Sequence, residues 1–171
     1  MKTMRLLGAA TIVTMVATTA CSGGDSVTTQ PVDATTVVTL DRMECFGACP
    51  SYSLTLDGSG TVSYQGRRFV KVVGTASVQI QVSTVQALVD KMIRADFFNL
   101  SVPATCPQGI STDGPTATTS LTLAGRSHSV EHYHGNACAP AVLDTIEEDI
   151  DLTAGSAAWV DCDTSSGYCP P

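Results

Sequence analysis

The chain has 171 residues, with 16 Asp or Glu against 9 Lys or Arg, so its formal net charge is −7. A chain this acidic repels polyanions, which argues against nucleic acid and anionic lipid surfaces as partners. The length suffices for one domain with a real hydrophobic core. With only 5% aromatic residues, that core must consist mostly of Val, Leu and Ile.

The first 20 residues have the pattern of a secretory signal peptide. Lys2 and Arg5 precede an uncharged apolar run over residues 6–17. This run is too short for a bilayer-spanning helix, which needs about 20 residues. Residues 1–20 are therefore predicted to be a leader that is removed from the mature protein.

Cys21 directly follows this leader, in the sequence Thr18-Thr19-Ala20-Cys21, which resembles a bacterial lipobox. In a lipobox the cysteine is acylated and becomes the mature N-terminus, and multiple acyl chains anchor a protein stably. Thr18 departs from the usual Leu, and the alternative is ordinary secretory cleavage with an incidental cysteine. We expect a lipoprotein that contacts the membrane through its lipid, and Ser22 favours the outer membrane.

Composition divides the rest of the chain into three parts. Residues 21–34 are rich in Ser, Thr, Gly, Asp and Pro and are expected to form a flexible, lipidated tether. Residues 35–160 carry the periodic apolar patterns of a single domain. Residues 161–171 form a tail that contains two cysteines.

Strand patterns dominate the first half of this domain. The expected strands are residues 36–40, 52–57, 62–64, 68–73 and a short run at 78–82. An Asp-Gly-Ser-Gly turn at residues 57–60 joins the second and third of them into a hairpin. A second hairpin is expected from residues 118–123 and 127–133, around an Ala-Gly turn.

Two amphipathic helices complete the pattern. Ser83 and Gln86 form a capping box for a helix that runs to about Ala95, with apolar residues at positions 85, 88, 89 and 92. The second helix follows Pro140 and stops near Gly155. Its apolar face consists of Val142, Leu143, Ile146 and Ile150, and its water-facing side of Glu147, Glu148, Asp149 and Asp151.

The order β-β-β-α-β-β-α, with short connections, predicts the fold class. We expect an α+β two-layer sandwich, in which an antiparallel sheet of about five strands carries two helices on one face.

Six further cysteines are expected to form a disulfide framework, because they are even in number and follow a secretory leader. The favoured pairs are Cys45–Cys49, Cys106–Cys138 and Cys162–Cys169. The motif Cys-x-x-x-Cys-Pro also resembles the copper motif of the Sco family of copper chaperones, which is the second interpretation. Thioredoxin-like redox chemistry is the third, but its Cys-x-x-Cys spacing is absent.

All three histidines lie within seven residues. On a strand His128, His132 and His134 share one face, and alternate residues are about 7 Å apart at Cα, close enough to share a metal ion such as zinc or copper. A carboxylate could complete the site, although Glu131 lies on the opposite face. The alternative is a polar, solvent-facing strand. No nucleophile elbow, phosphate-binding loop or dinucleotide fingerprint is present.

Several of these motifs together resemble a bacterial family described as domain of unknown function 6438. They are Cys-Phe-Gly-x-Cys-Pro-x-Tyr from Cys45, a strand ending in Asp-Gly-x-Gly, the Asp96–Leu100 patch, an Asp-x-Pro-Thr loop at residues 113–116, and a terminal helix before Trp159-Val160. The resemblance covers residues 36–160. It implies an envelope-associated domain and supplies no catalytic residues.

Two functional hypotheses follow. The first is a non-enzymatic module that binds or scaffolds a partner protein at the cell envelope. The second is a periplasmic protein that binds copper or zinc through the histidine cluster. An enzymatic role has the least support.

Overall fold

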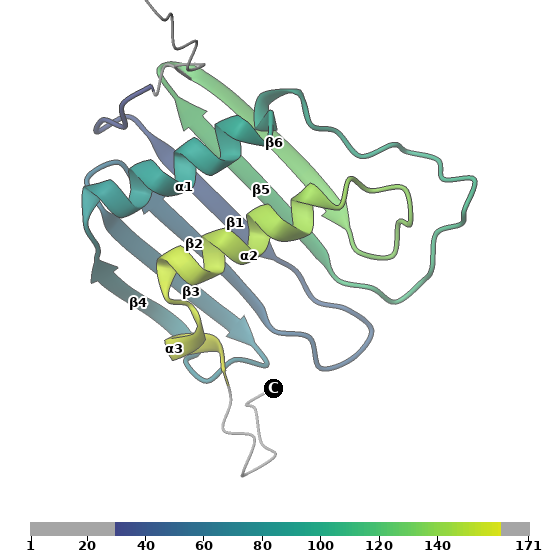
Figure 1. Cartoon of the computed structure of the whole chain (residues 1–171). Coiled ribbons are helices and arrows are strands. Elements are labelled where there is room, and N and C mark those ends of the chain that lie inside the picture. The colour runs from purple at the N-terminus through teal and green to yellow at the C-terminus, as the bar shows by residue number, and fades with distance from the viewer. Residues whose placement is uncertain (1–29, 162–171) are drawn as a thin grey trace, which may run out of the picture.

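The computed structural model describes residues 30–161 (Figure 1). Its strands are β1 (Val37–Arg42), β2 (Ser51–Asp57), β3 (Thr61–Arg68), β4 (Gly74–Gln79), β5 (Thr116–Leu123) and β6 (Arg126–Tyr133). Its helices are α1 (Val82–Arg94), the 3₁₀ turn η1 (Phe97–Asn99), α2 (Val142–Ala154) and the short α3 (Ala157–Val160). The leader, Cys21, residues 22–29 of the tether and the Cys162–Cys169 tail lie outside the described residues.

The strands form a single antiparallel sheet in the order β4-β3-β2-β1-β5-β6. Helices α1 and α2 lie side by side across one face of it (Figure 1). The α+β class is therefore as expected, but the sheet has six strands rather than about five, and four of them precede α1.

The core lies between the helices and the sheet. Alternate residues of the strands point at the helices, as Val38 and Leu40 do on β1 and Leu54 and Leu56 on β2, and all four are buried. The opposite sheet face carries mainly Ser, Thr and charged side chains. This one-sided alternation is typical of an antiparallel sheet with one covered face.

The expected strand at residues 68–73 is wrong. Strand β3 ends at Arg68, Phe69 adopts a left-handed φ of 55°, and β4 begins at Gly74. The segment between them is held by the C-terminal helix instead, because the amide of Val72 donates to the carbonyl of Trp159 at 2.9 Å. Val70 is buried in the core and Val72 packs against it without joining the sheet, whereas Val73 is exposed.

The expected capping box is also wrong, although helix α1 lies where the pattern placed it. The N-cap residue is Gln81, and no side chain caps it. The side chain of Gln86 is engaged elsewhere, since its oxygen accepts from the amide of Val32 at 2.8 Å and its nitrogen donates to the carbonyl of Gln30. Helix α2 ends as expected at Gly155, with φ 65°.

One end of the sheet gathers four chain segments. Because neighbouring strands are antiparallel, the end of β1, the start of β2, the start of β5 and the end of β6 lie together, beneath helix α2 (Figure 1). Among residues 30–161, no helix has both the length and the apolar composition needed to cross a bilayer.

Candidate functional site: a histidine–carboxylate cluster

A row of four residues crosses the sheet at this end. Arg42 pairs with Tyr52 on one side and with Ala117 on the other, and Ala117 pairs with His132. Directly paired residues project from the same face of a sheet, and here that face is the one covered by the helices. The small side chain of Ala117 separates the guanidinium of Arg42 from the imidazole of His132.

Helix α2 places three carboxylates over this row. Asp144, Glu147 and Asp151 are three and four residues apart, so they lie along one side of the helix. Glu147 is almost completely buried, with a side-chain exposure of 1%. A buried carboxylate is costly unless it is paired and hydrogen-bonded, and each of its oxygens has a partner.

Arg42 joins two of these carboxylates. Its Nη1 donates to Glu147 Oε2 at 3.0 Å, while Nε and Nη2 donate to Asp151 Oδ2 at 3.0 and 2.9 Å. Asp151 also accepts from the hydroxyls of Tyr52 at 2.7 Å and Ser156 at 2.6 Å. This network fixes the position of the buried carboxylate of Glu147.

The two histidines approach Glu147 from the other side. His132 Nδ1 lies 2.7 Å from Glu147 Oε1, and His134 Nε2 lies 3.0 Å from Oε2. The second nitrogen of His134 is 3.4 Å from Asp144 Oδ1. The imidazole rings stack, with centroids 4.2 Å apart. Two imidazoles and two carboxylates therefore converge at one point.

These distances suit a metal ion. One ligand atom from each of His132, His134, Asp144 and Glu147 lies within 4.8 Å of the other three. Zinc ligands at 2.0–2.1 Å in tetrahedral geometry are about 3.3 Å apart. The nitrogen–oxygen separations of 2.7, 3.0 and 3.4 Å are of this order, although they involve both ring nitrogens of His134, of which one ion would take only one.

The formal charge of the cluster also favours a divalent cation. Asp144, Glu147 and Asp151 carry three negative charges, and Arg42 carries one positive charge. Imidazoles that ligate a metal are neutral. With neutral histidines the cluster has an excess of two negative charges, which one divalent ion balances.

The network shifts the pKa values of Tyr52 and Arg42. Burial raises the pKa of Tyr52 far above its usual value near 10, and the negative charge of Asp151 acts in the same direction. Burial alone lowers the pKa of the Arg42 guanidinium, but the charges around it, chiefly that of Asp151, outweigh this effect and the net shift is upward. Arg42 is therefore a permanent cation of this network.

The structure does not bring His128 into the cluster. His128 lies four residues nearer the β5–β6 turn, about 13 Å along the strand from His132. Its Nε2 lies 2.8 Å from the carbonyl oxygen of Leu100, and its ring contacts Phe97 edge to face. Of the three expected histidines, two share a site and the third supports a loop.

The expected water-facing side of α2 is wrong for Glu147, which is buried, and incomplete for Asp149 and Asp151, whose side chains are 17% and 20% exposed. Position 147 follows Leu143 by four residues and Ile146 by one, so helical periodicity alone would have placed it inside. Arg42 was also missed, although it continues the inward alternation of Val38 and Leu40.

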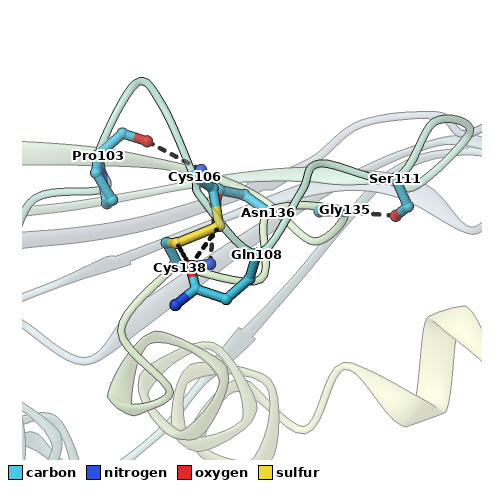
Figure 2. Close-up of a disulfide and its surroundings, with 7 residues drawn as sticks. All are labelled: Pro103, Cys106, Gln108, Ser111, Gly135, Asn136 and Cys138. Atoms are coloured by element: carbon cyan, nitrogen blue, oxygen red, sulfur yellow. Dashed lines mark hydrogen bonds between the residues drawn. A yellow bond between two sulfur atoms is a disulfide. The ribbon is translucent and has the colours of Figure 1, made fainter.

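None of the four described cysteines belongs to the histidine–carboxylate cluster. The structure joins Cys45 to Cys49 and Cys106 to Cys138, two of the three pairs expected. Because Cys45 and Cys49 are bonded to each other, they offer no thiolate, and the donor set consists of nitrogen and oxygen atoms. Figure 2 shows the Cys106–Cys138 bridge, which ties the loop before β5 to the segment after β6.

The fold and the site together define an α+β domain with a buried histidine–carboxylate cluster between its sheet and its second helix. The chain belongs to the family described as domain of unknown function (DUF6438), whose model matches residues 36–154, and the resemblance seen in the sequence is thereby confirmed. No curated protein matches the chain.

Proposed function

We propose that this protein is a non-enzymatic binding module of the cell envelope and that its ligand is one divalent metal ion, zinc or copper(II). One observation carries the proposal: the ligating atoms of His132, His134, Asp144 and Glu147 meet within 4.8 Å. Imidazole with carboxylate is a donor set that suits both ions, and it lacks the thiolates that favour copper(I).

The surroundings of the cluster support metal binding. Ligating carboxylates are usually hydrogen-bonded by a second set of residues that fixes their orientation. Arg42 does this for Glu147, and Tyr52 and Ser156 hold Asp151, which in turn holds Arg42. The buried ligands are thus positioned by contacts that do not depend on the ion.

The proposed location follows from the leader and from Cys21. A signal peptide followed by an acylated cysteine would export the domain and anchor it to a membrane, with the outer membrane favoured. Disulfide bonds persist in oxidising compartments, and the two bridges of the described residues support an extracytoplasmic location.

Calorimetric titration of the purified protein with zinc, and separately with copper(II), tests the metal proposal. We expect one ion per chain and at least a tenfold loss of affinity in His132→Ala and in His134→Ala, because each removes a ligand. His128→Gln is the matched control, since His128 lies on the same strand but outside the cluster; it should bind as the parent does.

The competing account is a purely structural network in which protonated histidines neutralise the carboxylates. That account predicts that no metal stays with the protein after dialysis and that His132→Ala only lowers the free energy of unfolding. If both outcomes are found and circular dichroism shows that the protein is folded, the metal proposal is wrong.

Lipid attachment is tested independently by labelling cells with radioactive palmitate. The chain should incorporate label, and Cys21→Ser should not. Secretion of an unlabelled parent chain into the soluble fraction would show that Cys21 is not an acylation site.

A further inference from the structure

Strand β6 forms one edge of the sheet, and its unpaired backbone groups can be assigned. The two-residue turn Ala124–Gly125 has φ angles of 48° and 76°, as in a tight hairpin whose flanking residues are a hydrogen-bonded pair. At the other end of the hairpin, the amide of His134 donates to the carbonyl of Pro115. Even-numbered residues of β6 therefore bond to β5, and odd-numbered residues point their N–H and C=O groups outward.

Most of these outward groups have no protein partner. Within residues 30–161, no hydrogen bond reaches the backbone N–H or C=O of Ser127, Ser129 or Glu131 from outside the sheet. Only the carbonyl of Tyr133 is used, by the amide of Asn136. The edge thus offers four donors and three acceptors in the alternating arrangement that another strand would bond.

A cavity of about 440 Å³ lies beside this edge. Ser129, Glu131 and Tyr133 line it on the strand side, and the segment Leu100–Ala104 with Ile110 forms much of the rest of its lining. The side chain of Ile110 is half exposed, at 49%. The cavity therefore combines unpaired backbone groups with apolar side chains.

The segment beside the edge is held in place at several points. His128 Nε2 contacts the carbonyl of Leu100 at 2.8 Å, and Asn136 Nδ2 donates to the carbonyl of Pro103 at 3.0 Å. Figure 2 shows the second tie together with the Cys106–Cys138 bridge. These ties preform the groove, which lowers the entropic cost of binding.

The charge in the groove is negative. Glu131 is the one carboxylate in its lining, is exposed, and makes no ion pair with any of the described residues. Opposite charges on directly paired strand residues are favourable. A peptide strand bound here would gain most with a Lys or Arg opposite Glu131.

We propose that this groove binds an extended segment of a partner protein, which adds to β6 as a seventh strand. Its backbone bonds to the outward groups of Ser129 and Glu131. A basic side chain of the segment pairs with Glu131, and an apolar side chain packs against Ile110. Backbone complementarity selects a polypeptide over other ligand classes. The inference is independent of the metal site.

The probe is a displayed library of random eight-residue peptides, panned against the purified protein and counter-selected on the Ser129→Pro variant. Proline at position 129 removes an outward N–H and leaves the β5–β6 ladder intact, a placement that edge strands tolerate. We expect selected peptides with alternating apolar residues and a Lys or Arg. Their affinity should fall at least tenfold on Ser129→Pro, and equally when alternate peptide amides are N-methylated.

Glu131→Lys provides a second variant that does not alter the backbone. Its affinity for basic peptides should be several-fold lower than that of the parent, and binding should return when the Lys or Arg of the peptide is exchanged for Glu. Glu148→Lys, a matched change on the exposed side of α2, should have neither effect. Far-UV circular dichroism and denaturant unfolding serve as the folding controls for all three variants. Failure to select any peptide, or equal binding to the parent and to Ser129→Pro, would overturn the proposal. Self-association of the parent through β6 in sedimentation, abolished by Ser129→Pro, would assign the edge to a second copy and also overturn it.

Discussion

Helices α1 and α2 have the same length and lie on the same face of the sheet, yet they contribute different chemistry. Each has 13 residues. The buried residues of α1 are all apolar: Val85, Leu88, Val89 and Met92. The buried residues of α2 follow the same helical periodicity but include Glu147. The buried face of α1 therefore contributes apolar packing only, while that of α2 contributes packing and also positions a carboxylate.

The difference shows how a small sheet can accommodate a buried ionic cluster. Glu147 lies in the middle of the buried row of α2, between Ile146 and Ile150, and its carboxylate contacts Arg42 and His132. Its desolvation is offset by charged and polar partners, and the rest of α2 still packs through Leu143, Ile146 and Ile150. Structural and functional roles are thus divided along a single helix.

The largest effect on stability should come from α1. Leu88→Ala removes a side chain that is only 2% exposed, and we expect the free energy of unfolding to fall by about 2–5 kcal/mol because a cavity remains in the core. Denaturant titration measures this loss. Zinc affinity of the folded variant should equal that of the parent, and a weakened zinc site would mean that α1 shapes the cluster as well.

Glu147→Gln should have the opposite profile. It keeps the size of the side chain but removes the charge of the central ligand, so zinc affinity should fall at least tenfold, a loss of about 1.4 kcal/mol or more. Competition with a chromophoric chelator measures the change. Glu148→Gln, one residue further along α2 and exposed, is the matched control and should bind zinc normally. Equal zinc affinities in the two variants would contradict the assignment of Glu147 as a metal ligand.

A smaller effect is expected from Tyr52→Phe. The variant loses the hydrogen bond to Asp151, which should lower the free energy of unfolding by about 0.5–1.5 kcal/mol at neutral pH. Thermal and denaturant unfolding measure this change. The corresponding region of α1 offers no buried titratable residue for comparison.

Tyr52 also predicts a dependence on pH. Burial, followed by the charge of Asp151, raises the pKa of Tyr52 above its unfolded value near 10. The neutral phenol is thus favoured in the folded state, and its contribution is complete below about pH 10 and is lost as the pH rises further, because the unfolded chain ionises first. Between about pH 9 and 11 the parent should lose stability more steeply than Tyr52→Phe, which retains only the weaker effect of Tyr64. Parallel curves would contradict the role given to burial.

The smallest effect should follow Asp144→Asn. The side chain of Asp144 is 62% exposed and lies at the outer end of the cluster, 3.4 Å from His134. Zinc affinity should fall less than tenfold, and stability should not change measurably because exposed ion pairs contribute about 0–1 kcal/mol. A loss as large as that of Glu147→Gln would place the ion nearer the surface than the distances indicate.

Local patterns predicted much of the fold. Both helices, the Asp57–Gly60 turn and the Ala124–Gly125 hairpin lie where periodicity and turn chemistry placed them. The segment at residues 68–73 does not form the expected strand, because its hydrogen bonds go to a C-terminal helix about 90 residues later. No local pattern contains that information.

The candidate site was predictable in part. Alternation on a strand brought His132 and His134 together, as expected. His128 shares their face but is too far along the strand, and distance along a strand decides which residues can share an ion. Glu147 was missed because its charge suggested exposure, whereas the periodicity of its helix indicated burial. Arg42 was missed because the expected strand ended at residue 40, two residues before the end of β1.

The most direct test of the account is the position of the ion itself. Anomalous diffraction at the zinc edge, from crystals of the zinc-loaded protein, should show one peak about 2.0–2.2 Å from an imidazole nitrogen of His132, an imidazole nitrogen of His134 and a carboxylate oxygen of Glu147. A zinc-saturated crystal without a peak between these residues, or with its peak elsewhere, would contradict the assignment of the cluster as a metal site.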